Sequence, residues 1–140
     1  MRVFIIDYPD VRSSALRGID KLTENDHVFI FYNSLAKKLT FDAMESIRRS
    51  NANIQSVDMG SSFLTKPLPI RIAATVGYYV GRDDCTHINV VSSRLAFEGL
   101  QNFCADMGLE SDRISFMENL DCSSDMQDDA NKYKDMDMSE

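Results

Sequence analysis

The sequence is poor in cysteine and histidine, and it contains no long apolar run. Its 140 residues include three cysteines and two histidines, and no two cysteines form a Cys-x-x-Cys pair. We therefore expect neither a zinc site nor a disulfide framework, and reduced thiols suit a cytoplasmic protein. No run approaches the roughly 18 apolar residues of a membrane span, and the first residues lack the basic-then-apolar pattern of a signal peptide. The expected location is the cytoplasm, without a membrane partner.

Basic residues are also scarce, with 15 Lys and Arg against 22 Asp and Glu. The stretch from Asp121 to Glu140 holds seven acids and two lysines, so most of the net charge of −7 lies there. The nearly neutral remainder lacks the dense positive field that sequence-independent binding to nucleic acid exploits, although a local basic groove stays open. We predict one folded domain over residues 1–119 and an acidic, disordered tail over residues 120–140.

Short apolar runs alternate along the chain with segments of helical length. The runs, which we predict to be strands, are 3–7, 27–32, 54–59, 87–91 and 113–117. The intervening segments, which we predict to be helices, are 12–22, 40–50, 67–81 and 94–107. Several runs are apolar at consecutive positions, as burial on both faces of a parallel sheet requires. The alternation predicts an α/β fold, namely a three-layer α/β/α sandwich around a mostly parallel five-stranded sheet.

Two of the predicted helices carry further signals. Thr40 is the first residue of the segment 40–50 and is a suitable N-cap for its helix, because its hydroxyl can accept a hydrogen bond from a free amide of the first turn. The helix expected over residues 67–81, "PLPIRIAATVGYYVG", is apolar on nearly all sides apart from Arg71. We therefore expect this helix to be the most deeply buried one.

Polar residues that could bind a ligand follow several of the predicted strands. In open parallel sheets, ligands bind beyond the carboxyl ends of the strands. Asp7 and Asp10 follow the first strand, Asp58 lies in the third, and Ser92 and Ser93 follow the fourth. Carboxylates at one such edge would bind Mg²⁺ or Mn²⁺, which prefer oxygen ligands and leave positions for phosphate and water. Because "DYPD" is also a good turn sequence, Asp10 can instead serve as a turn residue.

Two chemistries on this architecture use such an edge. A phospho-acceptor module of the response-regulator kind would use Asp7, Asp58 and Ser92, but the lysine expected after the fifth strand is missing from "RISFMEN". A metal-dependent nuclease would instead use a cluster of carboxylates to hold metal ions and to activate a water molecule against a phosphodiester.

Five segments of the chain match the pattern of a known family. They read "IDYPDV", "IDKLTENDHVFIFYN", "LTFDAMESI", "LPIRIAATVGYYVG" and "INVVSSRLAFEGL". In order and spacing they resemble a bacterial group of PIN-like domains, relatives of the PIN and NYN nucleases, over Val3 to about Ser115. The resemblance implies the PIN-like sandwich fold and a Mg²⁺- or Mn²⁺-dependent ribonuclease site. It also suggests a toxin–antitoxin or phage-defence setting, in which bacterial relatives of this fold often occur.

The chain departs from that family at its acidic site. The resemblance places the first and fourth site acids on Asp7 and Glu98, but the second falls on Pro69 and the third on Arg94. The lysine that flanks the third acid becomes Ser93. Because a guanidinium repels a divalent cation, Arg94 would instead neutralise a carboxylate of the site as an ion pair. The resemblance therefore implies a degraded metal site.

These departures favour a protein that no longer cleaves RNA. On this hypothesis Asp7 and Glu98 are vestigial, and the protein acts by binding a protein or a nucleic acid. Nucleic-acid or phosphate contacts would then come from the following residues: Arg71, Ser92, Ser93 and Arg94.

Other hypotheses stay open. The first alternative is an active Mg²⁺- or Mn²⁺-dependent endoribonuclease with a rearranged site of Asp7, Asp10 and Glu98, with Asp58 as a further candidate ligand. The second is the phospho-acceptor module of the response-regulator kind. A homo-oligomer in which a second chain completes the site is a third arrangement that the sequence leaves open.

Overall fold

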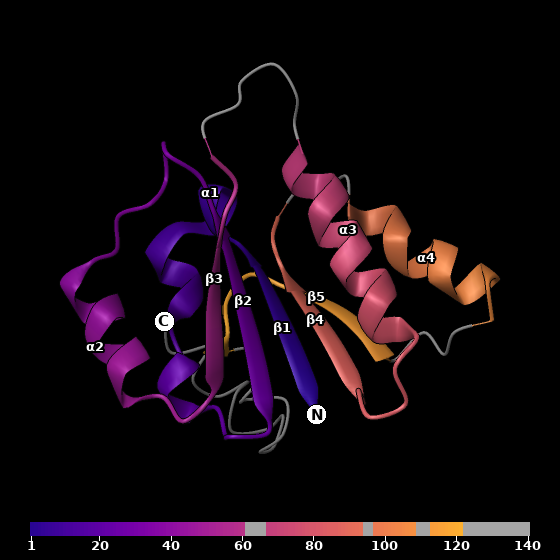
Figure 1. Cartoon of the computed structure of the whole chain (residues 1–140), viewed down its shortest axis with the longest axis horizontal. Helices are drawn as coiled ribbons and strands as arrows, with labels where there is room; N and C mark the ends of the chain where they lie inside the picture. Colours follow the sequence, from indigo (N-terminus) through magenta and orange to yellow (C-terminus); the bar gives the residue numbers. More distant parts are fainter. Residues whose placement is uncertain (61–66, 94–96, 109–112, 122–140) are drawn as a thin grey trace, which may run out of the picture.

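A computed structural model describes residues 1–60, 67–93, 97–108 and 113–121. Its centre is a five-stranded sheet in the order β3-β2-β1-β4-β5, in which all neighbouring strands are parallel (Figure 1). The strands are β1 (Arg2–Asp7), β2 (Asp26–Tyr32), β3 (Asn53–Asp58), β4 (His87–Val91) and β5 (Ile114–Met117). All the predicted strands are confirmed, and the predicted parallel sheet is confirmed with them.

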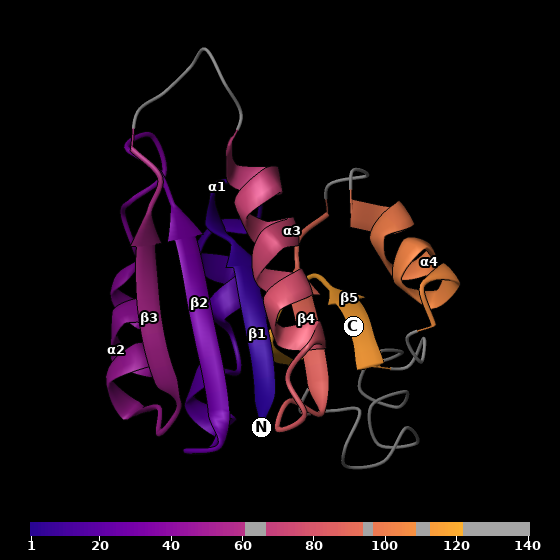
Figure 2. The ribbon, with the colours of Figure 1, turned by 45° about the vertical axis from the view of Figure 1, so that its right-hand side comes forward.

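Helices cover both faces of the sheet, which confirms the predicted α/β/α sandwich (Figure 2). One face carries α1 (Tyr8–Val11), two 3-10 helices, η1 (Arg12–Leu16) and η2 (Ile19–Lys21), and α2 (Phe41–Arg49). The other face carries α3 (Pro67–Val80) and α4 (Glu98–Asp106). Thr40 caps α2 as predicted, because its hydroxyl oxygen accepts a hydrogen bond from the Ala43 amide at 3.1 Å. None of the helices in the described ranges is long and apolar enough to cross a membrane.

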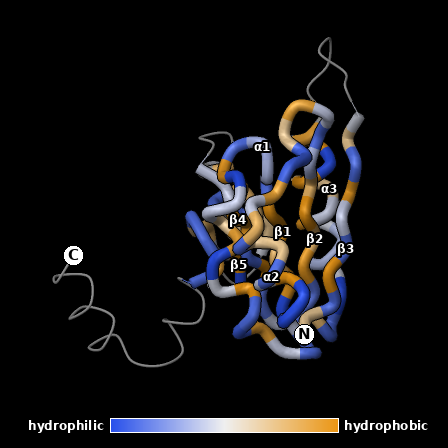
Figure 3. The backbone as a smooth tube through the Cα atoms, turned by 90° about the vertical axis from the view of Figure 1, so that its left-hand side faces the viewer, coloured by the Kyte–Doolittle hydropathy of each residue, from blue (hydrophilic) through white to orange (hydrophobic). Residues whose placement is uncertain are grey.

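The burial of the strands explains their sequences. In the central strand β1, residues 3–7 are fully buried, so both faces must be apolar and the run "VFII" has no polar alternation. The edge strand β3 has no buried residue, and its only apolar residues are Ile54 and Val57. Figure 3 shows the same contrast, with β2 mostly hydrophobic and β3 mixed. The β3 side of the sheet is therefore more thinly covered than its centre.

The predicted helix over residues 12–22 is wrong. Helix α1 begins earlier, at Tyr8, with Pro9 in its first turn, and the chain continues as the two 3-10 helices instead of one α-helix. Between them, Gly18 has φ +97°, which glycine adopts without the strain of a side chain. A Cβ at Gly18 would lie 2.7 Å from the backbone nitrogen of Asp121. The left-handed glycine therefore ends the helical run where the segment packs against Asp121.

The expectation that α3 is the most buried helix is also wrong. Ile72 and Val76 are fully buried, but Ile70 is 72% exposed and Tyr78 is 61% exposed. Helix α3 packs on β1 and β4, and Figure 2 shows the adjacent β2 and β3 without a described helix in front of them. Only one side of α3 is therefore covered within the described part of the chain, although the helix is apolar on nearly all sides.

The first two residues of the predicted tail, Leu120 and Asp121, pack against the folded domain. Leu120 is buried in the core on the α2 side of the sheet. Asp121 forms ion pairs with Arg17 at 3.3 Å and with Lys21 at 3.4 Å. The remainder of the predicted tail, 122–140, lies outside the described residues, so its disorder stays a prediction.

Candidate functional site

Asp7 and Asp10 flank the junction between β1 and α1. Asp7 is the last residue of β1, and its side chain is fully buried. Pro9 lies in the first turn of α1, where its missing amide hydrogen costs nothing because the first amides of a helix lack partners within the helix. The short helix returns the Asp10 side chain to the carboxyl edge of β4, where it contacts Ser93.

Two serines that follow β4 bind these carboxylates. The Ser92 hydroxyl donates to Asp7 Oδ2 at 2.8 Å and lies 3.5 Å from Asp10 Oδ2. Ser93 donates twice to Asp10 Oδ2, from its amide at 2.7 Å and from its hydroxyl at 2.8 Å. Ser92 is itself buried, and its amide donates to the Met117 carbonyl at 3.1 Å, which links the group to β5. The structure thus brings two acids and two serines of the predicted site together at one edge of the sheet.

The hydrogen bonds on Asp10 restrict its use as a metal ligand. A carboxylate oxygen has two lone pairs, and the amide and hydroxyl of Ser93 both approach Asp10 Oδ2 within 2.8 Å. A cation at this oxygen would have to displace one of these donors. Among the described side chains, no three of His, Cys, Asp or Glu gather closely enough to hold a metal ion. Within the described part of the chain, the candidate ligands at this edge are therefore the two carboxylates of Asp7 and Asp10, and both already accept hydrogen bonds from serines.

Asp58 lies apart from this group. It ends β3, and β2 lies between β3 and β1 in the sheet. Its Oδ1 accepts a hydrogen bond from the Gly60 amide at 2.8 Å, so it closes the turn after β3. A response-regulator sheet has the order 2-1-3-4-5, which places the third strand beside the first. The observed order separates Asp58 from Asp7, so the phospho-acceptor hypothesis lacks the strand arrangement that it needs.

Three of the other predicted site positions lie on α3 and α4, namely Pro69, Arg71 and Glu98. Arg71 is exposed on α3, and its guanidinium donates to the Met59 sulfur at 3.6 Å. Pro69 is partly buried in the first turn of α3, where it supplies no ligand oxygen from its side chain. Glu98 begins α4, but its side chain lies outside the described part of the structure, as does the whole of Arg94. Their contacts with metal or phosphate stay predictions.

Sequence reasoning missed a pocket that lies on the other side of β1 from the serines. Tyr8 directly follows Asp7, yet its buried ring lines a pocket together with Tyr32, Lys37 and Ser56. The only signal in the sequence is the presence of polar residues among the apolar ones of these strands, Tyr32 in β2 and Ser56 in β3. Nothing in the periodicity indicates that α2 leaves space above them.

A family model described as PIN domain matches residues 1–114 of the chain. The match begins before β1 and reaches the first residue of β5, so it includes the elements that carry Asp7, Asp10, Ser92 and Ser93. No curated protein and no solved structure matches the chain. The all-parallel sheet with helices on both faces agrees with the PIN-like sandwich. Because the match covers most of its length, the chain belongs to the PIN domain family.

Proposed function

We propose that this PIN-domain protein has a degenerate metal site and acts by binding a protein or RNA without cleaving it. The observation that carries the proposal is the hydrogen bonding of Asp7 and Asp10 by Ser92 and Ser93. Hydrogen bonds to an ionised carboxylate are stronger than those between neutral groups. The serine donors therefore stabilise the negative charge that a metal ion stabilises in a metal-dependent nuclease.

Two residues of the sequence support the same conclusion. Where the resembling bacterial group has its second and third site acids, this chain has Pro69 and Arg94. Proline removes a ligand without replacing it, and a neighbour or a water molecule can compensate for one such loss. Arginine adds a positive charge, which at about 4 Å interacts with another unit charge by roughly 4 kcal/mol at an effective dielectric of about 20. Against a divalent cation this interaction is repulsive and larger.

The outer face of α3 supports binding as the mode of action. Ile70 and Tyr78 are both exposed there, with Arg71 beside them. Exposed apolar groups rimmed by polar ones are typical of surfaces that contact other macromolecules. The partner on this proposal is a protein, a second copy of the chain or an RNA whose phosphates pair with Arg71. A toxin–antitoxin or phage-defence system, the setting suggested by the family resemblance, would supply such a partner.

A metal titration with a cleavage assay tests the proposal. Mn²⁺ and Mg²⁺ are titrated calorimetrically into the wild type, Asp7→Asn and Asp83→Ala, and each protein is incubated with single-stranded RNA. Asp83 is an exposed acid outside the site and serves as the matched control. We expect no saturable metal binding and no cleavage in any of the three proteins. Binding and cleavage that occur in the wild type and Asp83→Ala but vanish in Asp7→Asn would establish the active ribonuclease instead.

Reversion of the site gives a second, independent test. The double variant Pro69→Asp with Arg94→Asp restores both acids of the family pattern. If the site is degenerate because its ligands were lost, the double variant gains Mn²⁺ affinity over the wild type, and Arg94→Asp alone gains less. If the wild type and the double variant are both folded and bind Mn²⁺ equally, the hypothesis that Pro69 and Arg94 caused the loss of metal binding is contradicted.

A further inference from the structure

A pocket of about 410 Å³ lies between α2 and the part of the sheet formed by β2 and β3. Its lining residues are Tyr8, Ile30, Tyr32, Lys37, Leu39, Ile47, Ile54 and Ser56. This size falls within the range of about 300–1,000 Å³ that is typical of small-molecule sites. The lining contains neither Asp7 nor Asp10, so the pocket is distinct from the carboxylate site.

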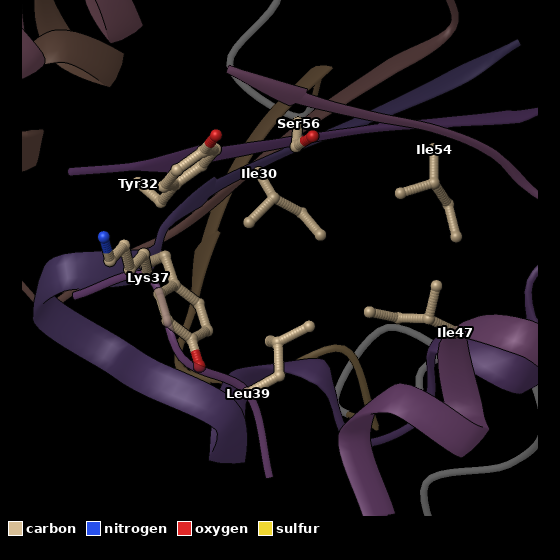
Figure 4. A pocket seen from close by; sticks show the side chains of 8 residues that line it. Ile30, Tyr32, Lys37, Leu39, Ile47, Ile54 and Ser56 are labelled. Atoms are coloured by element: carbon tan, nitrogen blue, oxygen red, sulfur yellow. The ribbon is translucent and has the colours of Figure 1, made fainter. Parts of the chain in front are cut away.

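One part of the pocket is aliphatic. Figure 4 shows Ile54 of β3 facing Ile47 of α2 at one end, and Ile30 of β2 facing Leu39 in the middle. Only Ile30 of these four is buried, whereas the other three pack against the core while remaining partly exposed. An apolar ligand would therefore bury surface that α2 and the sheet leave exposed to water.

The remaining part of the pocket carries hydrogen-bond donors. Tyr32 and Lys37 belong to the end opposite Ile54, and Figure 4 shows the Tyr32 hydroxyl pointing toward Ser56 and the Lys37 ammonium group pointing outward. Lys37 is exposed, so its flexible side chain can turn toward a ligand at this end. Among the described residues, no hydrogen bond or ion pair engages the Tyr32 hydroxyl, the Ser56 hydroxyl or the Lys37 ammonium group. Lys37 is also the only residue of this lining with a charged side chain. These groups offer donors and one positive charge, and no described acid neutralises that charge within the lining.

The Tyr8 ring forms a fixed wall of the pocket. Its hydroxyl group is hydrogen-bonded to Ser13 Oγ at 2.8 Å and to the Lys38 carbonyl oxygen. The same serine oxygen accepts a hydrogen bond from the Thr40 amide at 3.1 Å, which holds the segment before α2 against the ring. The Tyr8 wall of the pocket is therefore held in place by hydrogen bonds before a ligand binds.

We propose that this pocket binds a small organic anion with an apolar body, such as an aryl or alkyl carboxylate. The apolar body lies against Ile30, Ile47 and Ile54, and the carboxylate accepts hydrogen bonds at the end formed by Tyr32 and Lys37. A charge-assisted hydrogen bond to the ammonium group selects the anion over a neutral analogue of the same shape. The aliphatic part selects against anions without an apolar body. The proposal does not depend on whether the PIN site is degenerate.

The charge requirement is tested with a pair of probes, 2-naphthoate and the neutral 2-naphthalenemethanol. Each is titrated calorimetrically into the wild type, Lys37→Gln and Lys38→Gln, where Lys38 is the neighbouring lysine outside the lining. We expect 2-naphthoate to bind the wild type more tightly than the alcohol. Its Kd should rise about tenfold or more in Lys37→Gln and stay within about twofold in Lys38→Gln. Equal effects of the two lysine variants, or absence of 2-naphthoate binding to the wild type, would overturn the proposal.

The apolar requirement is tested on α2 with Ile47→Gln and Met44→Gln. Ile47 lines the pocket, whereas Met44 is half-exposed on the same helix and does not. Ile47→Gln should weaken the binding of both naphthalene probes severalfold, and Met44→Gln should leave it unchanged. Acetate, which lacks the apolar body, should not displace 2-naphthoate. Circular dichroism establishes that each variant is folded, so unchanged binding in a folded Ile47→Gln, or displacement by acetate at equal concentration, would refute the assignment to this pocket.

Discussion

The substitution Asp10→Ala separates two roles for the acid that lies three residues after the end of β1. If Asp10 holds the β1–α1 junction to Ser93, its loss removes the acceptor of both Ser93 hydrogen bonds and destabilises the protein. If Asp10 is chiefly a metal ligand, its loss relieves repulsion with Asp7 in the metal-free protein and leaves stability unchanged or raised. The sign of the change in unfolding free energy therefore distinguishes the two roles.

The hydrogen-bond geometry sets the size of the expected effect. The Ser93 amide and hydroxyl lie 2.7 Å and 2.8 Å from Asp10 Oδ2, and the Ser92 hydroxyl is a longer contact at 3.5 Å. A hydrogen bond to a charged group contributes about 1.5–3 kcal/mol when its partners are buried. Ser93 is exposed, so its freed donors regain water and part of that contribution is recovered. We therefore expect Asp10→Ala to lower the free energy of unfolding by about 1.5 kcal/mol.

Urea unfolding without metal, followed by circular dichroism, measures this change. With an m-value of about 1–3 kcal/mol/M, a loss of about 1.5 kcal/mol lowers the midpoint by about 0.5–1.5 M urea. Asp83→Ala removes an exposed acid elsewhere and should change the free energy by less than about 0.5 kcal/mol. An Asp10→Ala protein as stable as the wild type, or more stable, would refute the view that Asp10 joins β1 to β4.

Two further predictions concern the scaffold. Asp26 is buried, and burial by itself raises the pKa of its carboxyl group. The hydrogen bonds from Arg2 and from the Thr23 amide, together with the positive charge of Arg2, have the larger combined effect and hold this pKa below its ordinary value. Asp26→Asn should therefore lower the free energy of unfolding by about 3 kcal/mol at pH 7. The difference between the wild type and the variant should become smaller below about pH 4, because the wild-type carboxylate then takes up a proton. A difference in urea midpoint that does not change with pH would contradict this. Gly18→Ala should lower the free energy of unfolding by about 2 kcal/mol or more, because Gly18 has φ +97° and an added Cβ would meet the Asp121 backbone. Gly81→Ala is the control and should change the free energy of unfolding little, because an added Cβ there makes only ordinary contacts.

The strands and the site edge could be predicted because both depend on local pattern. A strand buried on both faces must be apolar at consecutive positions, which is how residues 3–7 read. In a parallel sheet, the carboxyl ends of the strands share an edge, so Asp7 at the end of β1 and Ser92 after β4 could be placed at the same edge from the sequence. The adjacency of β1 and β4, and with it the 2.8 Å hydrogen bond between these two residues, comes from the structure.

The parts that could not be predicted depend on contacts between distant segments. The apolar pattern of α3 does not say that it packs on β1 and β4 and leaves Ile70 and Tyr78 outside. The break in the segment 12–22 follows from the close approach of Gly18 to Asp121, about a hundred residues later in the sequence. The serines could be placed near phosphate from sequence, but their bonding to the two carboxylates is visible only in three dimensions.

The turn after β1 joins the two candidate sites through consecutive residues. Asp7 faces β4 and accepts its hydrogen bond from Ser92, whereas Tyr8 lies toward β2 and β3 and forms a wall of the pocket. Pro9 restricts the backbone between Tyr8 and Asp10, because its ring fixes φ. The Tyr8 hydroxyl bonds fix the ring to Ser13 and to the Lys38 carbonyl. The carboxylates and the pocket are thus joined by one short segment, in which Asp7 and Asp10 contact the serines after β4 and Tyr8 lines the pocket.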